Sequence, residues 1–141
     1  MSEVRLGLTL PSFREEVEPL LEVAAAAEAA GLDGVFAYDH LFRYGADGEV
    51  RPALEFTATL GALAASTEGI TIGSLVARAT LRPPAVLANT FDTARRIAGD
   101  RVVAGIGAGD AESRDEMETF GYPFGTESSR DRKSTRQLQS H

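Results

Sequence analysis

The clearest chemical signal in the sequence is an adjacent acid and imidazole, Asp39 and His40, directly after a short apolar run. Imidazole titrates near neutral pH and a neighbouring carboxylate can tune it, so such a pair can transfer protons. In the alternative interpretation, Asp39 caps the next turn and His40 is partly buried against Phe42. Their position at the end of a strand-like segment makes the functional interpretation about as strong as the structural one.

Three glycines at alternate positions, Gly105, Gly107 and Gly109, form a second candidate site. They do not fit the GxGxxG pattern of dinucleotide-binding proteins, because the third glycine would fall at Asp110 or at Glu112. The acidic residues that follow also oppose a pyrophosphate at that helix start. The turn can let a flat ring or a backbone approach closely, or it can simply allow tight packing at the end of a strand.

A third candidate surrounds Gly73, because a glycine inside a strand often marks the close approach of a ligand. Arg78 and Arg82 follow and could hold phosphate or carboxylate groups by bidentate contacts. On the residue types alone, ordinary surface arginines are the favoured interpretation. Further along, five acidic residues are expected to form the solvated face of a short helix. They are Asp110, Glu112, Asp115, Glu116 and Glu118.

Composition limits the classes of partner. The 141 residues include two histidines and no cysteine, so no metal site is predicted. The net charge of −7 argues against nucleic acid or an anionic membrane as the main partner. No segment approaches the ~20 apolar residues of a membrane helix, and no signal-like segment opens the chain. We therefore expect a soluble, cytoplasmic protein, whose few cations would have to be placed locally to hold an anionic ligand.

Strand-like and helix-like segments alternate along the chain and would position these candidate sites. This alternation is typical of βαβ units and a parallel sheet, an α/β fold. Four units fit either an open doubly wound sheet or half of a (βα)8 barrel, also called a TIM barrel. In both, ligands bind beyond the carboxyl ends of the strands, where the candidates lie. We expect strands at 4–10, 34–38, 70–76 and 101–106, helices at 16–30, 54–65, 83–98 and 112–120, and a loop over 39–51.

The end of the chain has a different character. Residues 126–141 are nearly all polar, and Leu138 is their only large aliphatic residue. Such a segment has no apolar stripe with which to cover a sheet. We expect a folded domain over 1–125 and a polar, disordered or loosely helical tail over 126–141.

Three stretches of the sequence occur in a recognisable order. They are GLDGVFAYDHLF, ITIGSLVARATLRPPAVLANTFDTARRIAGDRVVAGIGAG and METFGYPF. Together they resemble the luciferase-like monooxygenases, and most closely their branch that uses coenzyme F420, a deazaflavin hydride carrier. The resemblance covers about residues 4–125 and implies a (βα)8 barrel, of which this chain would supply the N-terminal half with about four strands.

The resemblance also implies roles for particular residues. The Asp-His pair would lie beside the reactive ring, with His40 handling a proton. A non-prolyl cis peptide bond, at Ser74–Leu75 or at Leu75–Val76, would form a bulge behind that ring. Asp110 would correspond to a carboxylate that is usually a glutamate in some deazaflavin-dependent dehydrogenases. The implied catalytic residues are His40, Asp39 and Asp110, and the implied cofactor-binding residues are Asp39, Ser74, Leu75, Val76, Gly107, Ala108 and Gly109.

The function that follows from the resemblance is hydride transfer between F420, or alternatively FMN, and a small organic substrate. A full member of the family needs eight units, so we expect a truncated chain whose activity is an open question. One alternative is a catalytically incompetent half-barrel that serves as a folding or dimerising unit, and another is a flavodoxin-like binding module. Because an open sheet edge is prone to pairing, we expect two half-barrels to form a homodimer.

Overall fold

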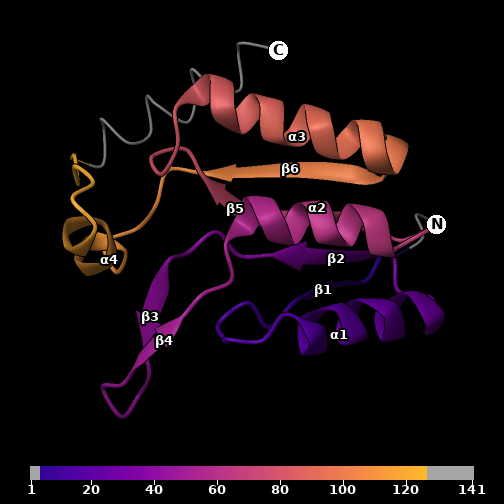
Figure 1. Cartoon of the computed structure of the whole chain (residues 1–141), viewed down its shortest axis with the longest axis horizontal. Coiled ribbons are helices and arrows are strands. Elements are labelled where there is room, and N and C mark those ends of the chain that lie inside the picture. Colours follow the sequence, from indigo (N-terminus) through magenta and orange to yellow (C-terminus); the bar gives the residue numbers. More distant parts are fainter. Residues whose placement is uncertain (1–3, 127–141) are drawn as a thin grey trace.

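The computed structural model describes residues 4–126 and contains a four-stranded parallel sheet (Figure 1). The strands follow one another in chain order, β1-β2-β5-β6, and every neighbouring pair is parallel. A doubly wound sheet needs a point at which the strand order reverses, and the described residues contain none. The order therefore confirms part of a barrel and excludes the flavodoxin-like alternative. The strands are β1 (Gly7–Thr9), β2 (Gly34–Ala37), β5 (Thr71–Arg78) and β6 (Val102–Gly107).

Three helices pack against one face of this sheet, and the core lies between them and the strands (Figure 1). Val35 and Ile72, which are paired across β2 and β5, are completely buried beneath side chains of all three helices. Pro84 opens the third helix, where its missing N–H is not needed, and Gly99 ends it with a positive φ of 68°. The helices are α1 (Glu18–Ala29), α2 (Phe56–Ser66) and α3 (Pro84–Ala98), each within two residues of its expected bounds at both ends.

The structure differs from the expected elements in three places. The expected loop over 39–51 contains an antiparallel hairpin, β3 (Phe42–Tyr44) and β4 (Val50–Pro52), so that expectation was wrong. The first strand is shorter than expected, because only Gly7–Thr9 pairs with β2. A short 3-10 helix, η1 (Gly99–Arg101), precedes β6. The short helix α4 (Arg114–Thr119) lies inside its expected range, and the predicted tail lies outside the described residues except for Thr126.

The other face of the sheet carries a large aromatic side chain over two glycines. Phe36 follows Val35, which is buried under the helices, and because successive side chains of a strand alternate between faces, Phe36 points away from the helices. A Cβ atom at Gly7 would lie 2.8 Å from Cε2 of Phe36, and one at Gly34 would lie 2.9 Å from the same atom. The ring of Phe36 thus occupies the space that side chains at both glycine positions would need.

Candidate active site

The carboxyl ends of three neighbouring strands meet at one edge of the sheet, here called the carboxyl edge. Asp39, just after β2, accepts a hydrogen bond of 2.8 Å from the backbone N–H of Arg78 at the end of β5. Arg78 is paired in register with Gly107 at the end of β6. The three candidate segments of the sequence therefore share one edge.

Asp39 is nearly fully buried and bonded to protein groups. Its Oδ2 atom accepts a second hydrogen bond, of 2.6 Å, from Nη1 of Arg82. Nη2 of Arg82 in turn donates to Glu55, the residue that caps α2, over 2.7 Å. The carboxylate of Asp39 thus ties β2, β5 and the start of α2 together. The favoured interpretation of Arg82 as an ordinary surface arginine was therefore wrong, since the side chain of Arg82 is only 13% exposed.

His40 belongs to a cluster of charged side chains with Glu116 of α4 and Arg78 of β5. Nδ1 of His40 lies 3.1 Å from Oε2 of Glu116, and Nη2 of Arg78 contacts both atoms. The other carboxylate oxygen of Glu116 accepts hydrogen bonds from the backbone N–H groups of Leu41 and Phe42. The side chains of Arg78 and Glu116 are 4% and 5% exposed, whereas that of His40 is 30% exposed. Glu116 therefore joins α4 to the segment that carries His40.

The charge state of Glu116 follows from these contacts. Burial raises the pKa of its carboxyl, but the hydrogen bonds that it shares with His40, Leu41 and Arg78 outweigh burial and lower the pKa to about 2. Glu116 is therefore ionised at neutral pH. The expectation of a solvated acidic helix face was wrong at this position, and so was the favoured surface interpretation of Arg78. The sequence offered no signal for this cluster, because Glu116 is 76 residues from His40 and 38 from Arg78.

A cleft of about 410 Å³ opens beside His40, between the hairpin and the start of α4. The ring of Phe13 packs 5.3 Å from that of His40, and the guanidinium of Arg43 lies 4.3 Å above the ring of Phe13. Asp110 lines the same cleft, but its Oδ1 atom accepts hydrogen bonds from the N–H and hydroxyl of Ser113. These bonds lower the pKa of Asp110. The cleft thus brings His40 and Asp110 together, and Asp39 is not among its lining residues.

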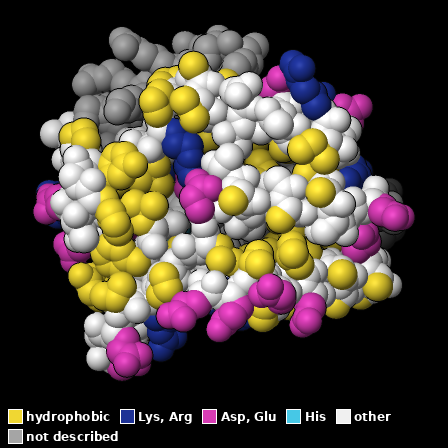
Figure 2. Space-filling view, in the orientation of Figure 1, with side chains coloured by type: hydrophobic (Ala, Val, Ile, Leu, Met, Phe, Trp, Pro, Cys, Tyr) yellow, Lys and Arg dark blue, Asp and Glu magenta, His cyan; other side chains and the backbone are white. Residues whose placement is uncertain are grey.

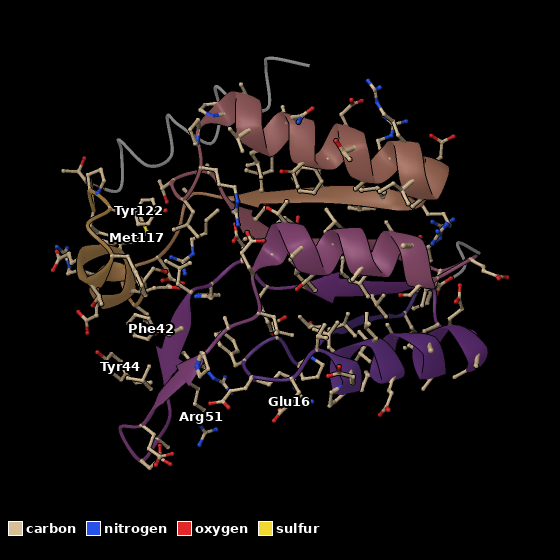
Figure 3. All side chains as sticks on the ribbon, in the orientation of Figure 1. Glu16, Phe42, Tyr44, Arg51, Met117 and Tyr122 are labelled. Carbon is tan, nitrogen blue, oxygen red and sulfur yellow. The ribbon has the colours of Figure 1, made fainter. Side chains whose placement is uncertain are left out.

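Apolar and aromatic side chains gather where the hairpin meets α4 (Figure 2), and two of them, Phe42 and Tyr44, also line the cleft. Phe42 lies 5.9 Å from Phe120 and 5.4 Å from Tyr44, measured between ring centroids. Figure 3 shows Phe42 and Tyr44 on the hairpin, and Met117 and Tyr122 on or just after α4. Tyr44 and Phe120 are more than half exposed. This cluster holds α4, and with it Glu116, against the hairpin.

The third candidate segment forms an irregularity in β5. A cis peptide bond joins Leu75 to Val76, the second of the two expected positions, and the pairing of β5 with β6 is interrupted there. Leu75 is 51% exposed and Val76 is 37% exposed. Ser74 is buried instead, and its hydroxyl donates to the carbonyl of Gly105 over 2.8 Å, so it serves the contact between the two strands.

The glycines of β6 are required by the closeness of β5. A Cβ atom at Gly105 would lie 2.3 Å from the carbonyl oxygen of Ser74, and one at Gly107 would lie 2.5 Å from Cγ2 of Val76. Gly109 has a positive φ of 82°, and Ala108 beside it is half-buried. Tight packing therefore accounts for Gly105 and Gly107, and it also places their backbone directly beside the exposed Val76.

Within residues 4–126, no three side chains of His, Asp or Glu are grouped so that they could hold a metal ion. In the same part of the chain, no helix combines the length and the apolar character needed to cross a membrane.

Comparisons with known proteins agree with this geometry. The F420-dependent glucose-6-phosphate dehydrogenase of Beutenbergia cavernae is 38% identical over 109 residues, which cover 77% of this chain and 32% of that enzyme. An F420-dependent secondary alcohol dehydrogenase, solved with an F420-acetone adduct, superposes with a TM-score of 0.83 at 24% identity over 98% of this chain and 41% of that one. The oxygenating constituent of 3,6-diketocamphane monooxygenase from Pseudomonas putida, solved with FMN, gives a TM-score of 0.72 at 18% identity over 95% and 37% of the two chains.

The structural similarities show the fold, and the sequence similarities show the family. The chain spans about a third of the length of the curated relatives it matches, and its described residues form a sheet of four parallel strands, where a complete (βα)8 barrel has eight. The family model for "Luciferase-like monooxygenase" matches residues 2–136, nearly the whole sequence. This chain therefore belongs to the luciferase-like monooxygenase family.

Proposed function

We propose that this chain carries part of the active site of an F420-dependent oxidoreductase, in which a hydride passes between the deazaflavin and a small organic substrate. The observation that carries the proposal is the shared carboxyl edge, where His40 and the turn after Gly107 follow β2 and β6 and the bulge at Leu75–Val76 lies near the end of β5 between them. The relatives named for F420 support this choice of cofactor, and the relative solved with FMN makes FMN the alternative.

The residues at this edge fit a flat, tricyclic ring. Leu75 and Val76 expose apolar side chains at the strand end, and Gly107 has no side chain to stand between Val76 and a ligand. Nη1 of Arg78 is buried and has no hydrogen-bond partner among the described residues, so this edge retains a donor that no described acceptor satisfies. When bound, F420 supplies the hydride chemistry, and the protein supplies orientation and proton transfer.

Three residues of the chain would divide the proton and positioning work. His40 lines the cleft and would accept the substrate's hydroxyl proton as the hydride leaves its carbon, which turns an alcohol into a carbonyl compound. Asp110 would hold the substrate from the opposite wall of the same cleft. Asp39 would help to position the cofactor indirectly, because it accepts a hydrogen bond from the backbone of Arg78 and so holds the end of β5 in place.

Titration of the purified chain with F420, followed by fluorescence, tests the proposal. We expect saturable binding that Gly107→Ala weakens about tenfold, because the new methyl group must displace Val76 at the ring's contact surface. Gly61→Ala is the matched control, since a Cβ atom there would meet nothing within 4 Å, and we expect it to bind as the parent chain does. A parallel titration that shows tighter binding of FMN would replace the deazaflavin with a flavin. Binding of neither would assign the activity to the longer relatives alone.

The second candidate is the half-barrel as a dimerising unit, favoured by its two open edges. Among residues 4–126, β1 and β6 each have a neighbouring strand on one side only, and Leu8 and Val103 on these strands are 37% and 45% exposed. A two-fold axis along the barrel would place β6 of one copy beside β1 of the other in the parallel sense. Sedimentation of the purified chain should then give a dimer. A monomer at every concentration would contradict this pairing.

A further inference from the structure

We propose that Glu116 is a positioning residue for His40: it holds the proton on Nδ1 and so leaves Nε2 to accept a proton on the cleft side. The inference deepens the proposed function and takes its chemical meaning from it. The tautomer itself can be measured in the chain without any cofactor.

Two arrangements of protons are compatible with the positions of the heavy atoms. In the first, Nδ1 of His40 carries the proton and donates it to Oε2 of Glu116, 3.1 Å away. In the second, Nδ1 is bare and accepts from the neighbouring Nη2 of Arg78. The proton on a histidine ring is placed by the hydrogen bond of each nitrogen, so the two arrangements give opposite tautomers.

The charge of Glu116 favours the first arrangement. The carboxylate is ionised at neutral pH and has no proton to donate. A bare Nδ1 would therefore face it with a lone pair at hydrogen-bond distance, which is repulsive. A protonated Nδ1 makes a charge-assisted bond, about twice as strong as a neutral one. In this arrangement Arg78 gives up its hydrogen bond to Nδ1, but its Nη2 keeps the bond to the same carboxylate.

The exposure of the ring identifies the nitrogen that is left for chemistry. Nδ1 faces the side chains of Glu116 and Arg78, which are 5% and 4% exposed, while the side chain of His40 is 30% exposed. The exposed edge of the ring is therefore the opposite one, which carries Nε2. Arg78 from β5 and Glu116 from α4 contact His40 directly. The other charged residues that line the cleft with it are Arg43 from the hairpin, Asp110 and Glu112 from the turn after β6, and Asp115 from α4.

Nitrogen NMR of the chain labelled with ¹⁵N-histidine reads the tautomer directly. The sequence holds two histidines, and His141→Gln leaves His40 as the only one. The measurement is made about two pH units above the ordinary imidazole pKa of ~6.5, where an unperturbed ring is neutral. We expect Nδ1 to be the protonated nitrogen. Glu116→Gln should lower the ratio of the Nδ1–H to the Nε2–H form about fivefold, because a neutral acceptor replaces a charged one. Glu112→Gln, a matched change in the same cleft without a bond to His40, should leave the ratio unchanged.

The outcomes separate this inference from the proposed function. A predominant Nε2–H form in the parent chain would overturn the inference without need of any variant, and so would equal ratios in the Glu116 and Glu112 variants. If the Nδ1–H form is found but F420 does not bind, the inference stands and the proposed function fails. If the chain binds F420 and is active with it, Glu116→Gln should lower kcat and leave the KM for F420 unchanged. The loss of a purely structural contact would instead change both kcat and KM.

Discussion

The amino and carboxyl edges of the sheet, where its strands begin and end, use the same kinds of charged residue in different ways. At the amino edge, where the strands begin, Glu28 of α1 accepts hydrogen bonds from the backbone N–H groups of Glu68, Gly69 and Ile70. Arg101 donates there to carbonyl oxygens and to the hydroxyl of Thr67. At the carboxyl edge, by contrast, Glu116 binds the side chains of Arg78 and His40 as well as the backbone N–H groups of Leu41 and Phe42.

This difference suggests that the charged residues of the amino edge stabilise the fold, whereas those of the carboxyl edge can also take part in proton transfer. Backbone groups do not titrate near neutral pH or reorient, so Glu28 and Arg101 have fixed partners and serve to close the amino edge. Side-chain partners can exchange protons, and those at the carboxyl edge adjoin an open cleft. The same division is general in (βα)8 barrels, whose ligands bind at the carboxyl ends of the strands. The comparison predicts that damage at the amino edge affects folding, whereas damage at the carboxyl edge also affects protonation.

The largest effect is expected at Arg101. Arg101→Ala should lower the free energy of unfolding by about 3 kcal/mol, because it leaves the carbonyl groups of Thr67 and Ile70 without their donor beside buried side chains. Urea denaturation measures the change. Arg96→Ala, which removes an exposed pair with Asp92, should cost less than about 0.5 kcal/mol. Equal losses in the two variants would break the comparison.

An intermediate and pH-dependent effect is expected at Glu116. Glu116→Gln should cost about 2 kcal/mol at neutral pH, since hydrogen bonds to a charged group are lost. The pKa of Glu116 is lowered from 4.5 to about 2 in the folded chain, so its stabilisation is complete above pH ~4.5 and is lost as the pH falls towards 2. Denaturation at several pH values should therefore show the two chains converging in acid. A difference that grows as the pH falls would contradict the ionised state, and Glu118→Gln, at an exposed pair, is the control.

The smallest effect is expected at Glu28. Glu28→Gln should cost about 1 kcal/mol, because the carboxylate is partly exposed and the amide oxygen can still accept some of the bonds. Hydrogen bonds from Gly69 and Ile70 lower the pKa of Glu28, so this stabilisation too should disappear as the pH falls below the ordinary value of 4.5. Glu22→Gln, on the exposed part of the same helix, should show no such change. An altered His40 tautomer in the Glu28 variant would show that the two edges are coupled.

The sequence predicted the elements that bury an apolar face. The three long helices and the strands β2, β5 and β6 all have runs or stripes of apolar residues, and their alternation along the chain predicted a parallel sheet. The alternation left the order of the strands open, and only the family resemblance favoured the sequential order of a barrel. The hairpin escaped prediction because its two strands are three residues long and mostly exposed, so no alternating pattern marks them. Short exposed strands are stabilised by their partners rather than by their own composition.

The candidate site was predictable only in the residues that follow the strands. His40 and the turn after Gly107 were found because the ends of parallel strands meet. Glu116 could not be found in this way, since it follows no strand and sits among four other acidic residues. Its burial depends on α4 folding back against the hairpin, which is a long-range contact. Local patterns in a sequence report charge and periodicity but not which carboxylate of a group will be enclosed.

The ring of Phe36 above Gly7 and Gly34 constrains how this sheet can evolve. A methyl group at either glycine would overlap the ring, whereas a shorter side chain in place of the phenylalanine would open a void between them. Substitutions at Gly7, Gly34 and Phe36 should therefore occur together, so that a smaller side chain at position 36 compensates for a larger one at position 7 or 34. Among homologues, a small residue at the second-strand position should accompany larger ones at its two companions.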